Sequence, residues 1–353
     1  MSERVPFAER GGPVRGLLDL ITGCYPAFLF GGAIGDQLPV FHLHEVTHEW
    51  LEPRLQFLAD NGYRTVTCGE IARFVVDGTR PAPRSIALTF DDAWSSAYTV
   101  AYPLLKQYGM SAVLFAIPAR VADEDSSSPF VTWPQLRELH SSGVFDVQSH
   151  TRTHTMMFAG DEVVGFASPE FEREPLLNRP LEADRLGTPL YVRRSRMSDA
   201  RRFYADETAA QRCRVHVATH GGAAFFDRPA WRDELRQIAN RSSALGAGGR
   251  AGRFESDGDR ASTIRAELAD ARAILSDRLG APVTHVAMPW GISGDIARRA
   301  AEDTGHVLCF AEEPLRRRAV RAGDDRFHLM RLNGKFITCL PGRGRTWFFS
   351  TVR

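Results

Sequence analysis

Three scarcities in this 353-residue sequence narrow the classes of protein to which it can belong. Cysteine is rare and scattered, at positions 24, 68, 213, 309 and 339, which suits neither a disulfide framework nor a thiolate zinc site. Charge excess is almost absent, with 44 basic against 43 acidic residues, so nothing indicates a nucleic-acid partner. Reduced, buried thiols are the expectation, and they favour a cytoplasmic protein.

Long apolar runs are also missing. The stretch 16–35 is apolar in patches, but Asp19, Pro26 and several glycines interrupt it. We therefore expect neither a signal peptide nor a membrane span, and interpret 1–35 as an N-terminal lead-in. Residues 36–353 are expected to form one domain, interrupted by a long insertion at about 158–259.

The sequence does contain short apolar runs that alternate with helical periodicity, and 43% of its residues are hydrophobic, enough for a substantial core. Alternation of strands and helices predicts parallel βα units, and about seven strands predict a barrel-like or doubly wound α/β sheet. The strands are expected at 40–43, 63–67, 85–92, 112–117, 144–148, 284–288 and 307–310, with a further candidate at 329–332.

The insertion has a looser pattern. It holds an arginine-dense patch at 193–202 and a glycine-rich tract at 246–258, which we expect to be mobile. The insertion is expected to be partly structured around 231–238.

Polar residues follow several of the expected strands. Within the stretch Ser85–Trp94, the apolar run 86–88 leads to the adjacent acids Asp91 and Asp92. The end of such a strand is where α/β folds place their chemistry, although a helix N-cap with an extra acid is an alternative. His150 and His154 are four residues apart, a spacing that places both imidazoles on one face of a helical turn. Two histidines and one carboxylate form a facial triad for a divalent metal, whereas a capping role is the alternative for the pair alone.

These motifs resemble those of a known family. Thr89-Phe90-Asp91-Asp92 and Ser149-His150-Thr-Arg-Thr-His154 are similar to the first two motifs of the polysaccharide deacetylase family, also called the NodB-homology or carbohydrate esterase family 4 domain. Pro289-Trp290-Gly291 resembles the third motif. Val40-Phe41-His42 and the segment from Asn61 to Val66 resemble the branch of poly-N-acetylglucosamine deacetylases. The resemblance covers about 36–157 and 262–335.

The resemblance implies a distorted (β/α) barrel and a divalent metal, commonly zinc, held by Asp92, His150 and His154. It also assigns catalytic roles to four residues: Asp91 as general base, His42 as general acid, the backbone N–H of Trp290 as oxyanion donor, and Arg331 as partner of Asp91. A salt bridge at the barrel edge is the alternative for Arg331. His328 would be the acid under the pattern of another branch, but its context does not match well.

The sequence departs from the family pattern in two motifs. Ala93 stands where glycine is usual, and Trp290 replaces the more common tyrosine, which removes a hydroxyl but leaves the backbone role.

The insertion follows His154 directly and can carry substrate contacts. The substrate-binding candidates are His44, Tyr191, Arg194 and Arg196, with a structural role or a solvated basic loop as the alternative.

The predicted function is therefore metal-dependent hydrolysis of the N-acetyl group of an acetylated amino sugar. We expect a small sugar-containing molecule in the cytoplasm as substrate, no nucleic-acid partner and no membrane span. The oligomeric state is not predicted. Hydrolysis of another C–N bond, in a cyclic amide or ureide, is an alternative on the same fold. A catalytically inactive carbohydrate-binding module is a second alternative, which the intact set of base and metal ligands disfavours.

Overall fold

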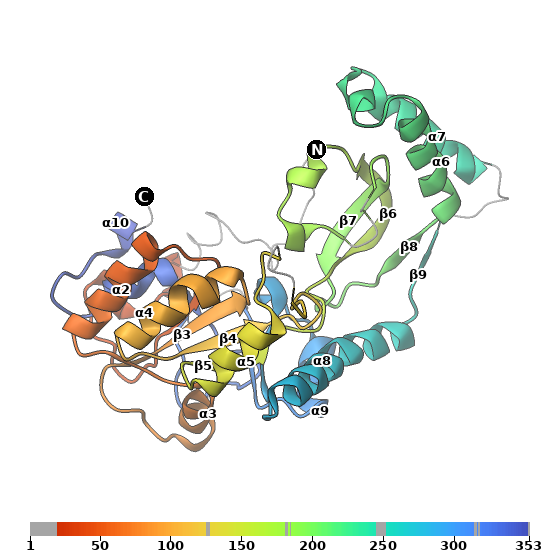
Figure 1. The fold of residues 1–353 in the computed structure, drawn as a ribbon. Helices are drawn as coiled ribbons and strands as arrows, with labels where there is room; N and C mark the ends of the chain where they lie inside the picture. Colours follow the sequence, from red (N-terminus) through yellow and green to blue (C-terminus); the bar gives the residue numbers. More distant parts are fainter. Residues whose placement is uncertain are drawn as a thin grey trace. The chain divides into compact units, whose positions relative to one another are not determined.

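The computed structural model describes residues 20–124, 128–180, 183, 185–244, 252–313, 316 and 318–351, without the side chains of 241–244. They form two compact units, which are treated separately. The core unit comprises the described residues of 7–153 and 265–353, and the insertion unit comprises those of 154–264 (Figure 1). Among the described residues, none of the helices combines the length and the apolar character needed to cross a membrane.

The core unit is built on one parallel sheet of eight strands. Seven strands follow the order β11-β10-β5-β4-β3-β1-β12, and β2 pairs with β3 outside this path. The strands are β1 (Val40–Leu43), β2 (Arg64–Thr65), β3 (Ser85–Asp92), β4 (Ala112–Ala116), β5 (Phe145–Ser149), β10 (His285–Ala287), β11 (Leu308–Phe310) and β12 (Leu332–Asn333).

The sheet nearly closes on itself. Phe310 of β11 forms an isolated parallel bridge with Leu329, and Leu332 pairs with Phe41 of β1 only three residues further on. The segment 329–333 thus joins the two ends of the sheet through a short, irregular connection. This arrangement confirms the prediction of a distorted (β/α) barrel with about seven parallel strands.

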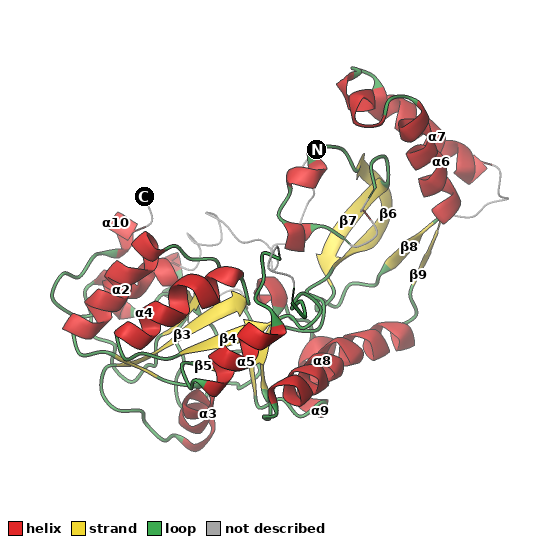
Figure 2. Ribbon diagram, in the orientation of Figure 1, coloured by secondary structure: helices red, strands yellow, loops and turns green. Residues whose placement is uncertain are grey.

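Helices follow most strands of the core unit (Figure 2). Thr132 begins one of them as expected from its capping-box spacing, since its hydroxyl accepts from the Gln135 N–H at 3.4 Å and the Gln135 side chain accepts from the Thr132 N–H at 2.9 Å. The helices are α2 (His48–Asp60), α3 (Cys68–Asp77), a π-helical turn (Ala97–Ala101) leading into α4 (Tyr102–Gln107), α5 (Trp133–Ser141), α8 (Asp257–Leu279), α9 (Asp295–Asp303) and α10 (Phe348–Thr351). Helix α8 begins in the insertion unit and continues into the core unit.

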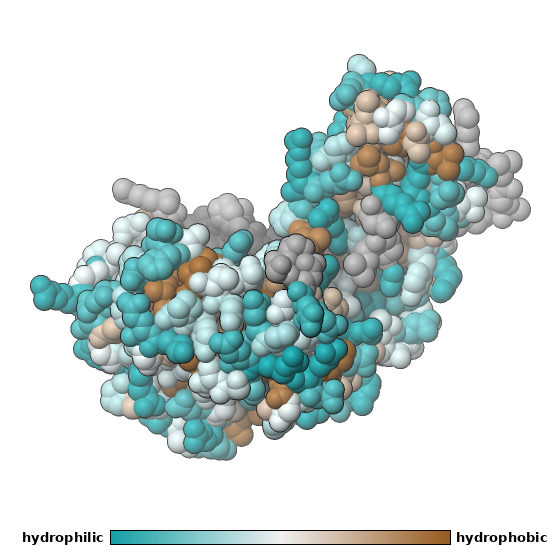
Figure 3. All heavy atoms as spheres, viewed as in Figure 1, coloured by the Kyte–Doolittle hydropathy of each residue, from teal (hydrophilic) through white to brown (hydrophobic). Residues whose placement is uncertain are grey.

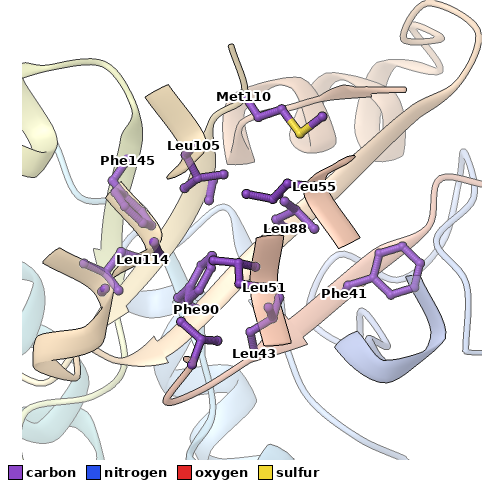
Figure 4. Close-up of a cluster of buried hydrophobic side chains, with 14 of the residues drawn as sticks. Phe41, Leu43, Leu51, Leu55, Leu88, Phe90, Leu105, Met110, Leu114 and Phe145 are labelled. Carbon is purple, nitrogen blue, oxygen red and sulfur yellow. The ribbon is translucent and has the colours of Figure 1, made fainter. Parts of the chain in front are cut away.

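Strand β3 shows how packing fixes the direction of the site residues. Leu88 and Phe90 pack with Leu51 of α2 in a large buried cluster, as Figure 4 shows. Ala87 belongs to a second buried cluster on the opposite face of the sheet. Because side chains alternate along a strand, Asp91 lies on the face of Ala87, away from the cluster that Leu88 and Phe90 join.

The insertion unit has more regular structure than the sequence predicted. Strand β6 (Met156–Phe166) pairs with β7 (Pro189–Ser195) in an antiparallel hairpin with register shifts, and β8 (Phe203–Ala205) pairs with β9 (Gly252–Phe254). Helix α7 (Trp231–Ala244) contains the predicted segment and packs with α6 (Glu207–Thr219). In the view of Figure 3, a hydrophobic patch lies over these two helices on an otherwise mostly hydrophilic surface.

The tract 246–258, which was expected to be mobile, divides into two parts. Residues 245–251 lie outside the described residues. The remainder contains β9 and the first residues of α8, so this part of the tract is regular structure.

Candidate active site

The carboxyl ends of three neighbouring strands meet at one edge of the sheet. Asp91 and Asp92 of β3 are in register with Phe115 and Ala116 of β4, and Ala116 is in register with Ser149 of β5. The next residue, His150, donates its backbone N–H to Ala116 at 2.8 Å. Parallel pairing therefore brings together the two acids and the first histidine, which are almost sixty residues apart in the sequence.

Asp91 is held by Arg331, as the resemblance implied. Each oxygen of the Asp91 carboxylate accepts a hydrogen bond of 2.7 Å from a different guanidinium nitrogen of Arg331. Arg331 also donates to the Thr89 hydroxyl at 2.9 Å, and its guanidinium lies over the rings of Phe115 and Phe310. Burial raises the pKa of Asp91, but the charge of Arg331 outweighs this effect and the net pKa lies below its ordinary value. Asp91 is therefore an ionised, fixed carboxylate.

Two histidines of the first strand region lie beside this pair. His42 belongs to β1, and His44 follows it with its Nε2 at 3.9 Å from Oδ2 of Asp91. The two imidazole rings meet edge to face, with centroids 5.6 Å apart. Burial, and after it the charge of Arg331, lowers the pKa of His42 to about 3, so this imidazole is neutral in the chain as described.

Asp92, His150 and His154 form a buried group suited to a metal ion. Each offers one ligand atom, and these atoms lie within 4.8 Å of one another. The separation between Nε2 of His150 and Oδ1 of Asp92 is 3.4 Å. Bonds of about 2.0–2.1 Å to a tetrahedral zinc place two ligand atoms about 3.4 Å apart, so this edge fits the ion. The chemistry of the donor set, two imidazoles and one carboxylate, fits as well.

Two further contacts orient these ligands. Nδ1 of His150 lies 2.8 Å from the Ala287 carbonyl, so it is the donor there and Nε2 is left to face Asp92. Trp94 donates its indole N–H to Oδ2 of Asp92 at 2.9 Å, which turns Oδ1 toward His150. Burial lowers the pKa of His150, but the carboxylates of Asp91 and Asp92 outweigh it and raise the net pKa. Partners of this kind raise metal affinity by fixing the ligand tautomer and direction.

The backbone of this region is strained. Five non-glycine residues have left-handed backbone conformations, each at a cost of about 1–2 kcal/mol. Their φ angles are 72° for Asp92, 61° for Ala93, 63° for Thr151, 52° for His154 and 54° for Trp290. The expectation that His150 and His154 share a helical turn is therefore wrong, because the chain bends at the left-handed Thr151 and is left-handed again at His154 itself. Strained residues of this kind concentrate at functional sites, where the surrounding structure holds them in place.

Glu267 of α8 holds this bend, and the sequence analysis missed it. Its carboxylate accepts from the Thr153 N–H at 2.9 Å and from the Thr153 hydroxyl at 2.8 Å. Its backbone carbonyl accepts from the Arg152 N–H at 3.0 Å, and one turn later Asp270 pairs with the Arg152 side chain at 3.0 Å. No signal in the sequence could have linked Glu267 to Thr153, because 114 residues separate them.

The third motif forms a tight turn after β10. Pro289, Trp290 and Gly291 make a short 3₁₀ turn two residues after Ala287, the residue that fixes His150. Gly291 has φ of 70°, and a Cβ there would lie 2.6 Å from the side chain of Glu312, so the position requires glycine. The turn thus presents Trp290 near the sheet edge that carries the acids.

The candidates in the insertion unit have structural partners. Tyr191 is buried between the rings of Phe158 and Phe203, and burial raises its pKa to about 12. Arg196 is buried as well and pairs with Glu255 at 2.8 Å. Arg194 is half-buried and donates to the backbone of its neighbour. These contacts account for the positions of the three side chains, and no bound ligand is needed to explain them. A role of these residues in substrate binding stays a prediction.

His328 lies outside this group. It is buried and pairs through Nδ1 with Asp325 at 3.1 Å, while its Nε2 lies 3.8 Å from Glu313. Neither partner belongs to the set around Asp91. The structure gives no support for His328 as the general acid.

The fold and this arrangement define a NodB-type barrel with buried acids and histidines at its strand ends. Comparison with known proteins agrees: the family model described as polysaccharide deacetylase matches residues 78–179. The resemblance found in the sequence is confirmed over this segment, which matches the polysaccharide deacetylase family.

Three similar proteins extend this finding. YxkH of Bacillus subtilis, which its name assigns to the polysaccharide deacetylases, is 29% identical over 126 residues, 33% of this chain and 43% of that protein. The poly-β-1,6-N-acetyl-D-glucosamine N-deacetylase of Escherichia coli (strain K12) is 32% identical over 113 residues, 29% of this chain and 17% of that protein. The structure of the BpsB deacetylase domain from Bordetella bronchiseptica shares the fold, with a TM-score of 0.56, 18% identity and coverage of 86% of this chain and 97% of that one. The chain therefore spans less than half of the curated relatives it matches.

Proposed function

We propose that this protein is a metal-dependent hydrolase that removes the N-acetyl group from an amino sugar. The observation that carries the proposal is the juxtaposition of two aspartates with separate environments. Asp92 lies 3.4 Å from His150 in a group suited to a metal ion, whereas Asp91 is fixed by Arg331 beside it. A binding module needs no such pairing of a metal group with an ionised base.

Asp92, His150 and His154 would hold the divalent cation, with zinc as the proposed ion because it prefers such N/O donor sets. When bound, a cation of this kind polarises the acetyl carbonyl and lowers the pKa of a water molecule toward 7. All three side chains are buried, so the charges act in a region of low dielectric.

Asp91 is the proposed general base. Its pKa lies below the ordinary value, so it is ionised at neutral pH and can accept a proton from the attacking water. Arg331 holds both oxygens, which fixes the direction of the carboxylate. Arg331 is thus proposed as a positioning residue for the base.

His42 is the proposed general acid. Its pKa of about 3 makes it neutral at the start, so it would have to receive the proton that Asp91 takes from the attacking water, and the two groups lie within 4.8 Å. It would then protonate the departing amine. The backbone N–H of Trp290 is proposed as a donor to the developing oxyanion, a role for which a tight turn at a strand end is well suited.

The substrate class rests on the relatives. Several of them are named as poly-β-1,6-N-acetyl-D-glucosamine N-deacetylases, and this supports an acetylated amino sugar here. A small sugar-containing substrate and a cytoplasmic location stay predictions from the sequence. The candidate residues of the insertion unit and His44 would contribute to the choice among such substrates.

Acetate release tests the proposal. Purified protein, stripped of metal and then loaded with zinc, should release acetate from at least one of a panel of N-acetylglucosamine monomers, oligomers and nucleotide-linked forms. The metal-free protein should release none. Turnover of a cyclic amide or ureide without any acetate release would reverse the order of the two hydrolase hypotheses.

A further inference from the structure

His42, His44 and Asp91 form a second cluster of metal-ligating side chains in the core unit. Each offers one ligand atom, and these atoms lie within 4.8 Å of one another. We infer that this cluster is a second, weaker site for a divalent cation such as zinc. Its occupation would block the acid and the base, so excess zinc would inhibit the enzyme. Only this inhibitory consequence rests on the proposed function.

The donor set has the same chemistry as the first group. Two imidazoles and one carboxylate suit zinc, and among the described residues only these two clusters combine such donors at close range. His42 and His44 are two positions apart at the end of β1, so their side chains project to the same side of the strand. Oδ2 of Asp91 faces Nε2 of His44.

The distances predict a weaker site. His44 and Asp91 are 3.9 Å apart, whereas the first group has a 3.4 Å edge between Asp92 and His150. A tetrahedral zinc requires about 3.4 Å between ligand atoms, so the second cluster must close by side-chain rotation before it binds. Its closing is feasible because the side chain of His44 is 53% exposed.

Arg331 also lowers the zinc affinity of this site, but it leaves acceptor capacity on Asp91. It donates one hydrogen bond to each oxygen of Asp91. A carboxylate oxygen has a second lone pair, so Asp91 keeps acceptor capacity for a cation. The guanidinium charge next to that cation is repulsive, and we expect occupation only when zinc is in excess over the first site.

Zinc binding tests this site without any substrate. Metal-free protein is dialysed against rising zinc concentrations, and bound zinc is measured by mass spectrometry. The parent protein should show one tight class of zinc and one weaker class. His44→Gln should lose the weaker class and keep the tight one, because His44 belongs only to the second cluster.

His48→Gln is the matched control. The His48 side chain is 57% exposed and lies 3.4 Å from Glu52, but it belongs to neither cluster. This variant should keep both classes of zinc. A weaker class that survives in His44→Gln, or a parent protein that saturates with the tight class alone, would overturn the inference.

Activity gives a second readout. Excess zinc should inhibit acetate release by the parent, and the inhibiting concentration should rise severalfold in His44→Gln relative to its own uninhibited rate. Two zinc classes without any acetate release would support this site and contradict the proposed function. Acetate release by a protein that binds a single class of zinc would support the proposed function and contradict this site.

Discussion

Asp91 in the core unit and Glu255 in the insertion unit are both buried carboxylates that pair with an arginine, yet their surroundings differ. Asp91 and Arg331 lie beside His44, and the charge of His150 also acts on Asp91, so several ionisable groups crowd together. Glu255 accepts instead from Arg196 at 2.8 and 3.0 Å and from a backbone N–H. The pair of Asp91 and Arg331 lies among groups that can exchange protons, whereas the pair of Glu255 and Arg196 joins distant segments of the insertion unit.

Backbone strain separates the two regions in the same way. Asp92, Ala93, Thr151 and Trp290 of the core unit have left-handed φ angles, and so does His154, at which the chain enters the insertion unit. In the rest of the insertion unit, as far as the structure describes it, only glycines have positive φ. Arg84, which directly precedes β3, also has a positive φ, so most but not all of this strain lies at the candidate site, and little of it lies in the insertion.

The largest effect is expected at the base. Asp91→Asn should leave the metal group intact but reduce turnover by about 10²–10⁴-fold, the usual contribution of a general base. Zinc content and acetate release are measured on the same preparation. His150→Ala is the comparison, since it should lose both zinc and turnover. Equal turnover in Asp91→Asn and the parent would remove Asp91 from the mechanism.

A large effect on stability alone is expected in the insertion unit. Glu255→Gln keeps the side-chain shape but leaves the Arg196 charge buried without its counter-ion, which should destabilise this unit by about 3–5 kcal/mol. Hydrogen exchange of the amides of 154–264 measures the loss, and zinc affinity should stay unchanged.

Asp257→Asn is the matched control for that prediction. It weakens the ion pairs of an exposed carboxylate with Arg201 and Arg260, so we expect at most about 1 kcal/mol. If Glu255→Gln weakens zinc binding as strongly as it weakens the insertion unit, the separation of the two regions is wrong.

A smaller effect on metal affinity is expected from the residue that holds the bend before His154. Glu267→Ala removes the carboxylate that accepts from the N–H and the hydroxyl of Thr153, and we expect zinc affinity to fall by about 10–100-fold, as for other residues that orient ligands. Chelator competition measures this, and the absorption spectrum of the cobalt-loaded protein reports the ligand geometry. Asp270→Asn, which removes only an exposed pair with Arg152, should change neither. An unchanged cobalt spectrum in Glu267→Ala would make Glu267 merely a stabilising residue.

The smallest effect is expected at Ala93. Its left-handed backbone has a strain of about 1–2 kcal/mol, which glycine would relieve. The lost methyl group and the greater freedom of the unfolded chain offset most of this gain, so Ala93→Gly should be nearly neutral. Ala301→Gly, at a buried helical position without such strain, should destabilise by about 1–2 kcal/mol. Equal losses in the two variants would show that Ala93 is not strained.

The sequence was sufficient where local pattern determines structure. The buried run from Ser85 to Asp92 predicts a strand because apolar residues fill both of its faces, and the structure has β3 there. The capping box at Thr132 predicts the start of α5 because both partners lie within one turn. The motif residues at 91, 92, 150 and 154 follow strands whose parallel pairing brings their ends together.

Prediction from the sequence failed where residues far apart in the chain determine the local conformation or the pairing. The spacing of His150 and His154 suggested a helical turn, but Glu267, more than a hundred residues away, holds the bend that the chain adopts. The buried pair of Arg196 and Glu255 was also missed, because 59 residues separate the two side chains in the sequence. The hairpin of β6 and β7 was missed because its register shifts break the alternation that identifies strands.

Anomalous diffraction at the zinc edge tests the central claim most directly. Crystals of the protein prepared with one equivalent of zinc should show a single strong peak between Asp92, His150 and His154, with ligand distances of about 2.0–2.2 Å. Asp91 should lie outside the ligand sphere and keep its two bonds to Arg331. A peak elsewhere, or coordination of that ion by Asp91 in place of Asp92, would contradict the division of roles between the two aspartates.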